Sequence, residues 1–256
     1  MGKIIAVANQ KGGVGKTTTS VNLAAALGRK KKKTLLIDTD PQGNATSGVG
    51  VNKREMQQSV YNMLIGNTRA SQLVQKTKFD NLWVIPASMD LAGAEVELVE
   101  LPDRINRLKK GIIGVKDQFD FIIIDCPPSL GLITLNALNA ADSVLIPIQC
   151  EYYALEGLSQ LMATVRTGKK KYNNALDVEG VLLTMFDGRL NLTTQVVEEV
   201  KKYFAGKVYK TVIPRNVRLS EAPSFGEPVL YYDKGSKGSK AYLDLTQEVI
   251  KNNKKR

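Results

Sequence analysis

Histidine is absent from this 256-residue chain, and cysteine occurs only twice. Without histidine the protein lacks the commonest zinc ligand and the commonest general base. Any hydrolysis that it catalyses must therefore depend on carboxylates, lysines and a metal ion. Cys126 and Cys150 each lie within or beside an apolar run, so we expect two buried free thiols in a reducing cytosol, and neither a disulfide nor a metal site.

Long hydrophobic runs are also absent. No run is long enough to span a bilayer, and the N-terminal region has no apolar stretch of the kind that forms a signal peptide. The apolar fraction of 43% and the charged fraction of 24% are ordinary for a globular protein in water. No linker, repeat or low-complexity segment divides the chain, which predicts a single cytoplasmic domain over residues 1–256 with a basic tail at about 251–256.

Short apolar runs alternate with segments of helical spacing along the chain. This alternation predicts an α/β fold whose mostly parallel, twisted sheet is flanked by helices on both faces. Ligands of such sheets bind beyond the carboxyl ends of the strands. Strands are expected at 3–8, 34–38, 82–85, 121–125, 144–148, 181–184 and 208–213, and helices at 17–27, 131–140, 153–167, 192–204 and 239–251.

A glycine-rich loop, Lys11-Gly-Gly-Val-Gly-Lys-Thr-Thr18, joins the first expected strand to the first expected helix. The usual phosphate-binding loop, G-x-x-x-x-G-K-[ST], has a glycine six residues before its lysine, but Gln10 occupies that position here. The glycines let backbone amides point at an anion, Lys16 can reach the β- and γ-phosphates, and the Thr17 hydroxyl can bind Mg²⁺. We therefore predict a P-loop NTPase of the deviant Walker A type, with nucleotide contacts from Lys11, Gly12, Gly13, Val14, Gly15, Lys16, Thr17 and Thr18.

Three aspartates follow apolar strands at the edge of the sheet where this loop must lie. Asp125 matches the carboxylate that holds Mg²⁺ through its water shell. Asp40 begins a loop and is placed to orient or activate water; with Thr17 and Asp125 it is a candidate for the metal site. How these roles divide between Asp38 and Asp40 stays open from the sequence. One such acid often only forms a turn or caps a helix, but three beside a phosphate loop favour a metal-and-water site.

Positive charge gathers towards the C-terminus. The chain has 36 Lys and Arg against 25 Asp and Glu, a net charge of +11. Residues 201–256 alone carry 13 Lys and Arg against five Asp and Glu, which makes a local charge of +8. Such an excess suits a polyanionic partner, either nucleic acid or anionic lipid.

Three motifs together resemble the ParA family of partition ATPases: the loop at 11–18, Leu35-Leu-Ile-Asp-Thr-Asp-Pro-Gln-Gly-Asn44 and Ile122-Ile-Ile-Asp-Cys-Pro-Pro-Ser129. The deviant loop marks a broader class that includes MinD and the nitrogenase iron protein. Two further stretches, Cys150-Glu-Tyr-Tyr-Ala-Leu-Glu-Gly157 and Ile213-Pro-Arg-Asn-Val-Arg-Leu-Ser-Glu-Ala-Pro223, are close to the chromosomal subgroup called Soj. The resemblance runs from Lys3 to about Asp244.

The resemblance implies an Mg²⁺-dependent ATP hydrolase that partitions chromosomes or plasmids. ATP would close two subunits face to face, with Lys11 of each reaching the phosphates bound by the other. The dimer would bind double-stranded DNA without sequence preference, and a ParB/Spo0J-type centromere-binding protein would stimulate hydrolysis and release it. The implied catalytic residues are Lys11, Lys16 and Asp40, and the implied location is the bacterial nucleoid.

The resemblance also implies functions for residues outside the three motifs. Pro214 and Asn216 would lie near the adenine, and Glu151 near the ribose across the dimer interface. The DNA-facing surface would include Arg189 and Arg218, with Lys234, Lys237 and Lys240 as further candidates.

Three other functions are built on the same kind of loop. A MinD-like regulator at a membrane needs a C-terminal amphipathic helix with a basic face. Here Asp244 and Glu248 occupy the polar face of 241–250, so we expect this helix to pack on the domain and do not expect a membrane partner. An iron–sulfur reductase needs paired cysteines, which Cys126 and Cys150 do not supply. A metabolic ligase or kinase stays open.

Overall fold

A computed structural model describes residues 2–150, 154–189 and 191–254. In these residues seven strands form one sheet, in the order β3-β4-β2-β5-β1-β6-β7. All neighbouring pairs are parallel except β3 and β4, and the predicted α/β fold with a mostly parallel sheet is confirmed. The strands are β1 (Lys3–Val7), β2 (Thr34–Asp38), β3 (Gln75–Lys76), β4 (Leu82–Ile85), β5 (Phe121–Asp125), β6 (Ser143–Gln149) and β7 (Asp177–Thr184).

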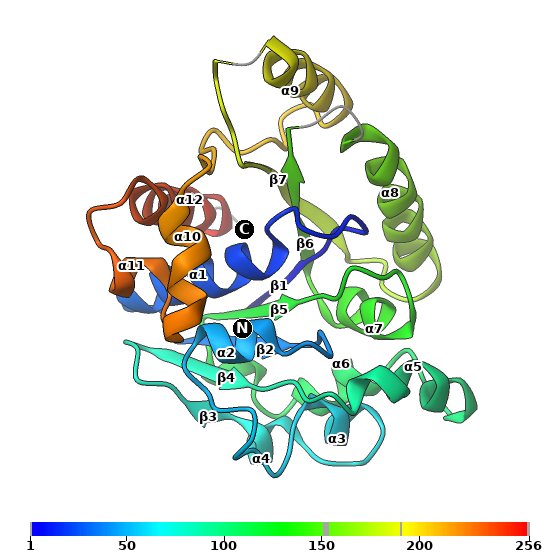
Figure 1. Cartoon of the computed structure of the whole chain (residues 1–256). Helices are drawn as coiled ribbons and strands as arrows, with labels where there is room; N and C mark the ends of the chain where they lie inside the picture. The colour runs from blue at the N-terminus through cyan, green and yellow to red at the C-terminus, as the bar shows by residue number, and fades with distance from the viewer. Residues whose placement is uncertain (1, 151–153, 190, 255–256) are drawn as a thin grey trace.

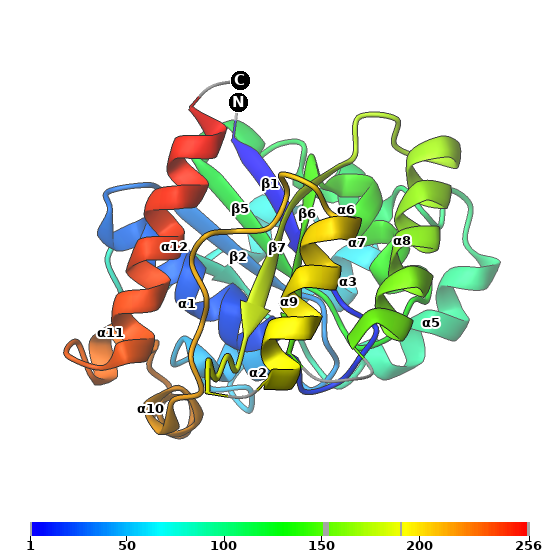
Figure 2. The same cartoon turned by 90° about the horizontal axis from the view of Figure 1, so that it is seen from above.

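Helices cover both faces of the sheet, and Figure 2 shows α1, α11 and α12 on one side and α7, α8 and α9 on the other. The five helices expected from the sequence correspond to α1, α7, α8, α9 and α12, whereas the ten-residue α5 and the shorter helices were not among them. The helices are α1 (Lys16–Arg29), α2 (Asn44–Gly48), α3 (Val60–Leu64), α4 (Ala70–Leu73), α5 (Leu91–Glu100), α6 (Arg107–Ile112), α7 (Leu132–Ala140), α8 (Ala154–Lys171), α9 (Asn191–Tyr203), α10 (Val217–Glu221), α11 (Val229–Tyr232) and α12 (Lys237–Asn253), with 3-10 turns at Lys116–Gln118 and Ala222–Phe225.

The alternation of side chains along each strand divides the core in two. In β1, Ile4 and Ala6 belong to the hydrophobic cluster under α3 to α9, and Ile5 and Val7 belong to the cluster under α1 and α12. Successive strand residues point to opposite faces, so a strand that is buried on both faces has to be apolar throughout. This requirement explains why the central strands read as unbroken hydrophobic runs.

One expected strand does not form. Residues 208–213 run beside β7 and donate backbone hydrogen bonds to it, from the Tyr209 amide to the Val181 carbonyl at 2.9 Å and from the Ile213 amide to the Leu183 carbonyl at 2.8 Å. The bridges here, Val181 to Val208 and Phe186 to Pro214, are isolated and form no ladder. The amides of Lys210 and Thr211 instead donate to the carboxylate of Glu248 in α12, at 2.9 and 3.2 Å. The prediction of a strand was wrong: the pairing with β7 is interrupted between Tyr209 and Ile213, where Glu248 accepts from two of the amides in between.

Strand register brings the predicted site together. Val7 and Asp38 both pair with Asp125, so the chain leaves β1, β2 and β5 side by side at one edge of the sheet. Figure 1 shows α1 starting at this edge, beside the end of β1. The loop at 11–18 therefore lies next to the acidic ends of β2 and β5.

The C-terminal helix packs on the domain, as expected. Tyr242, Leu245 and Val249 of α12 are buried in the cluster beside α1, and the Thr19 hydroxyl of α1 lies 3.2 Å from the Tyr242 hydroxyl. Its apolar face is thus already covered. Among the described residues, no helix is long and apolar enough to cross a membrane.

Candidate nucleotide site

The loop at 11–18 owes its shape to glycines and to the anchoring side chain of Asn9. Gly13 and Gly15 have φ of 74° and 87°, a left-handed conformation that L side chains rarely adopt. Asn9 accepts from the Lys11 amide at 3.0 Å and donates to the Pro147 carbonyl at 2.7 Å, which fixes the entry to the loop. Gly15 caps the N-terminus of α1, so the helix dipole is directed at whatever anion the loop holds.

Both lysines of the loop take part in its structure. Lys16 is only 7% exposed, and its ammonium donates to the backbone carbonyl of Lys11 at 3.0 Å. Burial lowers the pKa of Lys16, while the nearby carboxyl groups of Asp125 and Asp40 oppose that shift. An ammonium group on the phosphate loop, close to these two carboxyl groups, is placed to meet phosphate oxygens.

Asp125 lies fully buried at the end of β5. Its Oδ1 accepts from Ser20 of α1 at 2.8 Å, while its buried Oδ2 has no hydrogen-bond partner. Burial raises the pKa of Asp125, and the neighbouring carboxylate of Asp38 raises it further, while hydrogen bonding from Ser20 and Thr17 lowers it. An unpartnered carboxylate oxygen beside the Thr17 hydroxyl fits a hydrated Mg²⁺.

Acidic side chains alone do not form a complete metal-coordination site here. In the described part of the chain, no group of three Cys, Asp or Glu side chains could hold a metal ion. Mg²⁺ often keeps several waters and takes one or two protein ligands together with substrate phosphates, so such a cage is not required.

Asp38 and Asp40 have different surroundings. Asp38 is fully buried, and its Oδ2 accepts from the Thr46 amide and the Thr46 hydroxyl, both at 2.7 Å. Burial raises the pKa of Asp38, and the hydrogen bonds from Thr46 and from the Asp40 amide oppose that shift. Asp38 thereby holds the turn into α2. Asp40 instead lines the cavity beside the phosphate loop, although it is only 8% exposed and its Oδ1 accepts from the Gln42 amide at 2.9 Å.

Two adjoining cavities meet at the start of α1. One, of about 370 Å³, is lined by the phosphate loop, Asp40, Gln42, Asn44, Pro128 and Met185. The other, of about 440 Å³, is lined by the apolar and polar side chains of 213–223, including the predicted Pro214 and Asn216. Gly15, Thr18 and Met185 line both. Together the two cavities are large enough for a nucleotide. The lining is polar around the phosphate loop and mixes polar and apolar side chains where the base would lie.

Sequence reasoning missed two residues between these cavities. The Thr184 hydroxyl, at the end of β7, donates to the Val14 carbonyl at 2.9 Å and fastens the loop to the sheet. Met185 follows with a φ of 49°, unusual for a residue with a side chain, and lines both cavities. The only signal for them was their position at and just after the end of an expected strand, at the edge where ligands bind.

The candidate DNA-binding residues lie on the surface. Arg189 donates to Asp187 through Nε at 2.9 Å and through Nη2 at 2.6 Å. Arg218 pairs with Glu221 at 2.8 Å and with Asp233 at 3.3 Å. Both arginines are therefore neutralised in part by carboxylates. The lysines at 234, 237 and 240 are exposed near the start of α12. Glu151 lies outside the described residues.

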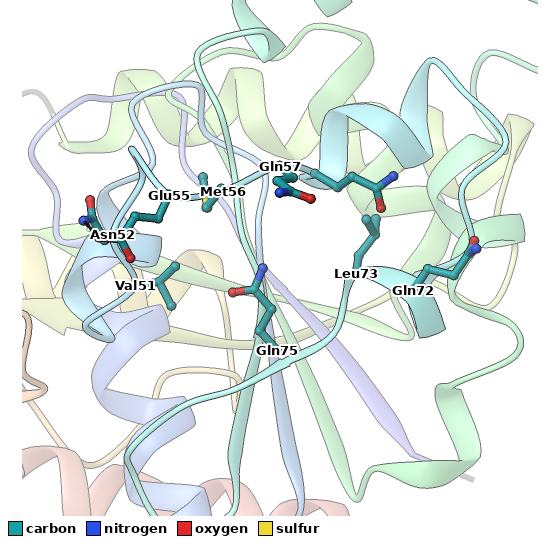
Figure 3. A pocket seen from close by; sticks show the side chains of 9 residues that line it. Val51, Asn52, Glu55, Met56, Gln57, Gln72, Leu73 and Gln75 are labelled. Atoms are coloured by element: carbon teal, nitrogen blue, oxygen red, sulfur yellow. Dashed lines mark hydrogen bonds between the residues drawn. The ribbon is translucent and has the colours of Figure 1, made fainter.

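Another cavity lies away from this site, between the α2–α3 connection and the edge strand β3 (Figure 3). It measures about 530 Å³ and is lined mainly by amide side chains, among them Asn52, Gln57, Gln72 and Gln75. None of the predicted site residues lines it, and it contains no basic side chain that could bind a phosphate. The side chains that could bind a nucleotide line the cavities around the phosphate loop.

Comparison with known proteins supports the same conclusion. The family model described as an AAA domain matches residues 2–178. Sporulation initiation inhibitor protein Soj of Bacillus subtilis is 62% identical over 252 residues, covering 98% of this chain and 100% of that protein. Chromosome partitioning protein ParA of Myxococcus xanthus is 54% identical, covering 98% and 89%. Among solved structures, a cobyrinic acid a,c-diamide synthase from Mycobacterium smegmatis with bound ADP and magnesium superposes with a TM-score of 0.87 at 35% identity, covering 99% and 96%.

Proposed function

The chain belongs to the ParA/Soj family of chromosome-partitioning ATPases, and from this membership we propose that ATP joins two copies into a dimer that binds DNA without sequence preference. It is an ATP-hydrolysing enzyme that depends on Mg²⁺. One ATPase domain spans residues 1–256, and the protein works in the cytoplasm on the nucleoid. A ParB/Spo0J-type partner stimulates hydrolysis and releases the dimer from DNA.

The observation that carries this proposal is the contact between the two lysines of the loop. Lys16 is buried and lies against the loop, so it binds the β- and γ-phosphates of its own subunit. Lys11 stands at the entry to the loop, half-buried, where a second subunit that faces the site comes within its reach. One lysine then binds nucleotide in its own subunit, and the other links nucleotide to the dimer.

The acidic residues have two different roles, binding of Mg²⁺ and positioning of the attacking water. Thr17 and Asp125 would hold Mg²⁺, which would supply positive charge to neutralise the phosphates. Asp40 positions the attacking water, because it faces the phosphate cavity while Asp38 is engaged with Thr46. With no histidine in the chain, alignment and charge neutralisation carry the reaction more than a strong base does.

Nucleotide specificity lies in the second cavity. Pro214 and Asn216 contact the adenine there, together with Met185 and Thr18 at the junction with the phosphate cavity. The buried Oδ1 of Asn216 has no hydrogen-bond partner within the protein, so it is available to a donor such as the exocyclic amine of adenine.

DNA binding follows from charge and from dimerisation. Arg189 and Arg218, with Lys234, Lys237 and Lys240, provide a few phosphate contacts in each subunit. Two subunits on one duplex double these contacts and raise the affinity steeply, which couples DNA binding to ATP. A membrane partner is disfavoured because the apolar face of α12 is already packed on the domain.

A metabolic activity is the second candidate, since the solved structure that superposes with a TM-score of 0.87 is a diamide synthase. The 62% identity to Soj over 98% of this chain favours partitioning instead. The deciding experiment compares binding of random-sequence duplex DNA to the apo protein and to its complexes with ADP and with a slowly hydrolysed ATP analogue. Binding only with the analogue, together with a doubled mass in light scattering, supports the proposal. Equal DNA affinity in all three states would contradict it.

A further inference from the structure

Lys53 is an exposed lysine whose side chain reaches the turn that carries Asp40. Its ammonium group donates to the Gln42 carbonyl at 2.7 Å. The side chain lies across Gly43, because a Cβ atom built on that glycine would meet the Lys53 Cδ at 2.8 Å. Asp40 and Gln42 both line the phosphate cavity. Lys53 is not among the residues that line this cavity, and it meets the site through the turn.

The turn Asp40-Pro41-Gln42-Gly43 is closed by two hydrogen bonds. The Gly43 amide donates to the Asp40 carbonyl at 2.9 Å, and the Gln42 amide donates to the Asp40 Oδ1 at 2.9 Å. Pro41 restricts the backbone φ at the second position of the turn. The Asp40 carboxylate and the Gln42 carbonyl therefore belong to one stiff unit, so a contact that holds the carbonyl also holds the carboxylate.

The segment that carries Lys53 is itself braced. The Asn52 side chain accepts from the Arg54 amide at 3.1 Å and donates to the Glu55 carboxylate at 2.6 Å (Figure 3). Glu55, the carboxylate nearest to Lys53 in the sequence, is thus engaged by Asn52. In the described part of the chain Lys53 forms no ion pair, and its one hydrogen bond is the bond to Gln42.

Stability does not explain why a lysine is held in this way. Fixing a long exposed side chain costs conformational entropy, and exposed charges contribute little to the free energy of unfolding. Helix α2 begins directly after the turn, with Gly43 as its N-cap, and the dipole of a helix opposes a cation at this end. What the contact does accomplish is to fix the position of the turn, and with it the direction of the Asp40 carboxylate.

We propose that Lys53 is a positioning residue for ATP hydrolysis, which holds the Asp40 turn so that the carboxylate stays aligned with the attacking water. Lys53 acts through the Gln42 carbonyl and touches neither the nucleotide nor the water. A displacement of about 1 Å in a reacting group can slow a reaction about 100-fold, so a single hydrogen bond to the turn can have a large effect on turnover. This inference rests on the proposed role of Asp40.

The first test removes the ammonium group. Lys53→Met keeps most of the length of the side chain, and its turnover at saturating ATP, measured by phosphate release without DNA, should fall about tenfold. Its affinity for a fluorescent ATP analogue should stay within about twofold of the parent, and its midpoint of thermal unfolding within about 2 °C. Arg54→Met is the matched control, because it removes one positive charge from the exposed neighbour in the same turn, and it should behave as the parent in all three measurements.

The conservative variant distinguishes the hydrogen bond from the rest of the side chain. Lys53→Arg keeps a charged donor that can reach the same carbonyl, and its turnover should be within about threefold of the parent. Parental turnover in Lys53→Met, or turnover in Lys53→Arg as slow as in Lys53→Met, would overturn the proposal. A loss of ATP affinity in Lys53→Met as large as its loss of turnover would also overturn it, since the lysine would then serve nucleotide binding.

A double variant tests whether Lys53 acts through Asp40. Lys53→Met added to Asp40→Ala should slow turnover no further than Asp40→Ala alone, because the carboxylate that Lys53 positions is already gone. A further loss of about tenfold would give Lys53 an independent role and contradict the proposal. Normal turnover in Asp40→Ala would refute the role of Asp40 and this inference with it. Slow turnover in Asp40→Ala beside normal turnover in Lys53→Met would refute the inference alone.

Discussion

The ammonium group of Lys16 donates a hydrogen bond to the backbone carbonyl of Lys11, 3.0 Å away, so the two lysines of the phosphate loop are in direct contact. Lys16→Ala removes the charge that meets the phosphates and should weaken ATP binding by about 100-fold or more. Lys11→Ala should still bind ATP but should neither dimerise nor turn it over. Equilibrium binding of a fluorescent ATP analogue, with light scattering, separates the two outcomes. Equal loss of affinity in both variants would mean that Lys11 acts within its own subunit.

Gly12 has open space around it, since a Cβ atom there would meet nothing within 4 Å, and its φ is not left-handed. A valine at this position should therefore fold and bind ATP in one subunit. If two loops approach each other in the dimer, Gly12→Val should remain monomeric by light scattering with ATP. Gly13→Val is the contrast, because the φ of 74° at Gly13 strains any side chain and should impair nucleotide binding itself. A Gly12→Val protein that still dimerises would rule out the face-to-face arrangement.

Asp40 and Asp38 should differ in what their loss affects. Asp40→Ala should bind ATP and stay trapped as an ATP-bound dimer with little turnover, because the attacking water loses its orientation. Asp38→Ala leaves the buried groups of Thr46 unpaired and should lower the free energy of unfolding by about 1–3 kcal/mol. Phosphate-release assays and denaturant titrations measure the two effects. Normal turnover in Asp40→Ala would move the catalytic role to Asp38.

Asp125 makes binding of Mg²⁺ and ATP depend on pH. The pKa of Asp125 is raised in the folded protein. At pH values between the usual pKa of a carboxyl group and this raised pKa, the folded protein therefore keeps a proton that the unfolded chain has lost. The free energy of unfolding falls as the pH rises through this range. A cation beside Asp125 favours the charged form, so binding should release this proton and strengthen from about pH 6 to about pH 8. Titration calorimetry of Mg²⁺ and ATP binding, repeated in buffers of different ionisation enthalpy, gives the number of protons that binding releases. Asp125→Asn should abolish the release; an unchanged count would assign it to another group.

Arg189 and Arg218 are predicted to contact DNA phosphates. Arg189→Glu and Arg218→Glu should each lose DNA binding and flatten the dependence of log affinity on log salt, by about 0.9 for each phosphate contact removed. Both variants should still form the ATP-dependent dimer. Arg54→Glu changes the net charge equally in an exposed loop at the far edge of the sheet and serves as the control. Unchanged DNA affinity in both variants would mean that the ion pairs with Asp187 and Glu221 are the whole role of these arginines.

The sequence by itself determined the central strands of the sheet and the phosphate loop, whereas the edge strand β3 was not foreseen. Strands buried on both faces must be apolar throughout, so the runs ending at Val7, Asp38 and Asp125 could be recognised without coordinates. Glycines that need left-handed backbone, followed by a lysine and a hydroxyl at the start of a helix, form a local pattern whose chemistry does not depend on distant residues.

Only the tertiary structure decided the features that depend on contacts between distant residues. Asp38 and Asp40 look alike in sequence, but Thr46 engages the first and leaves the second facing the cavity. Glu248 accepts from two amides of 208–213 at the point where the pairing of that segment with β7 is interrupted, and Thr184 anchors a loop 170 residues away in the chain. Such pairings are chosen by how the elements pack, and packing is a property of the whole chain that no local window of sequence contains.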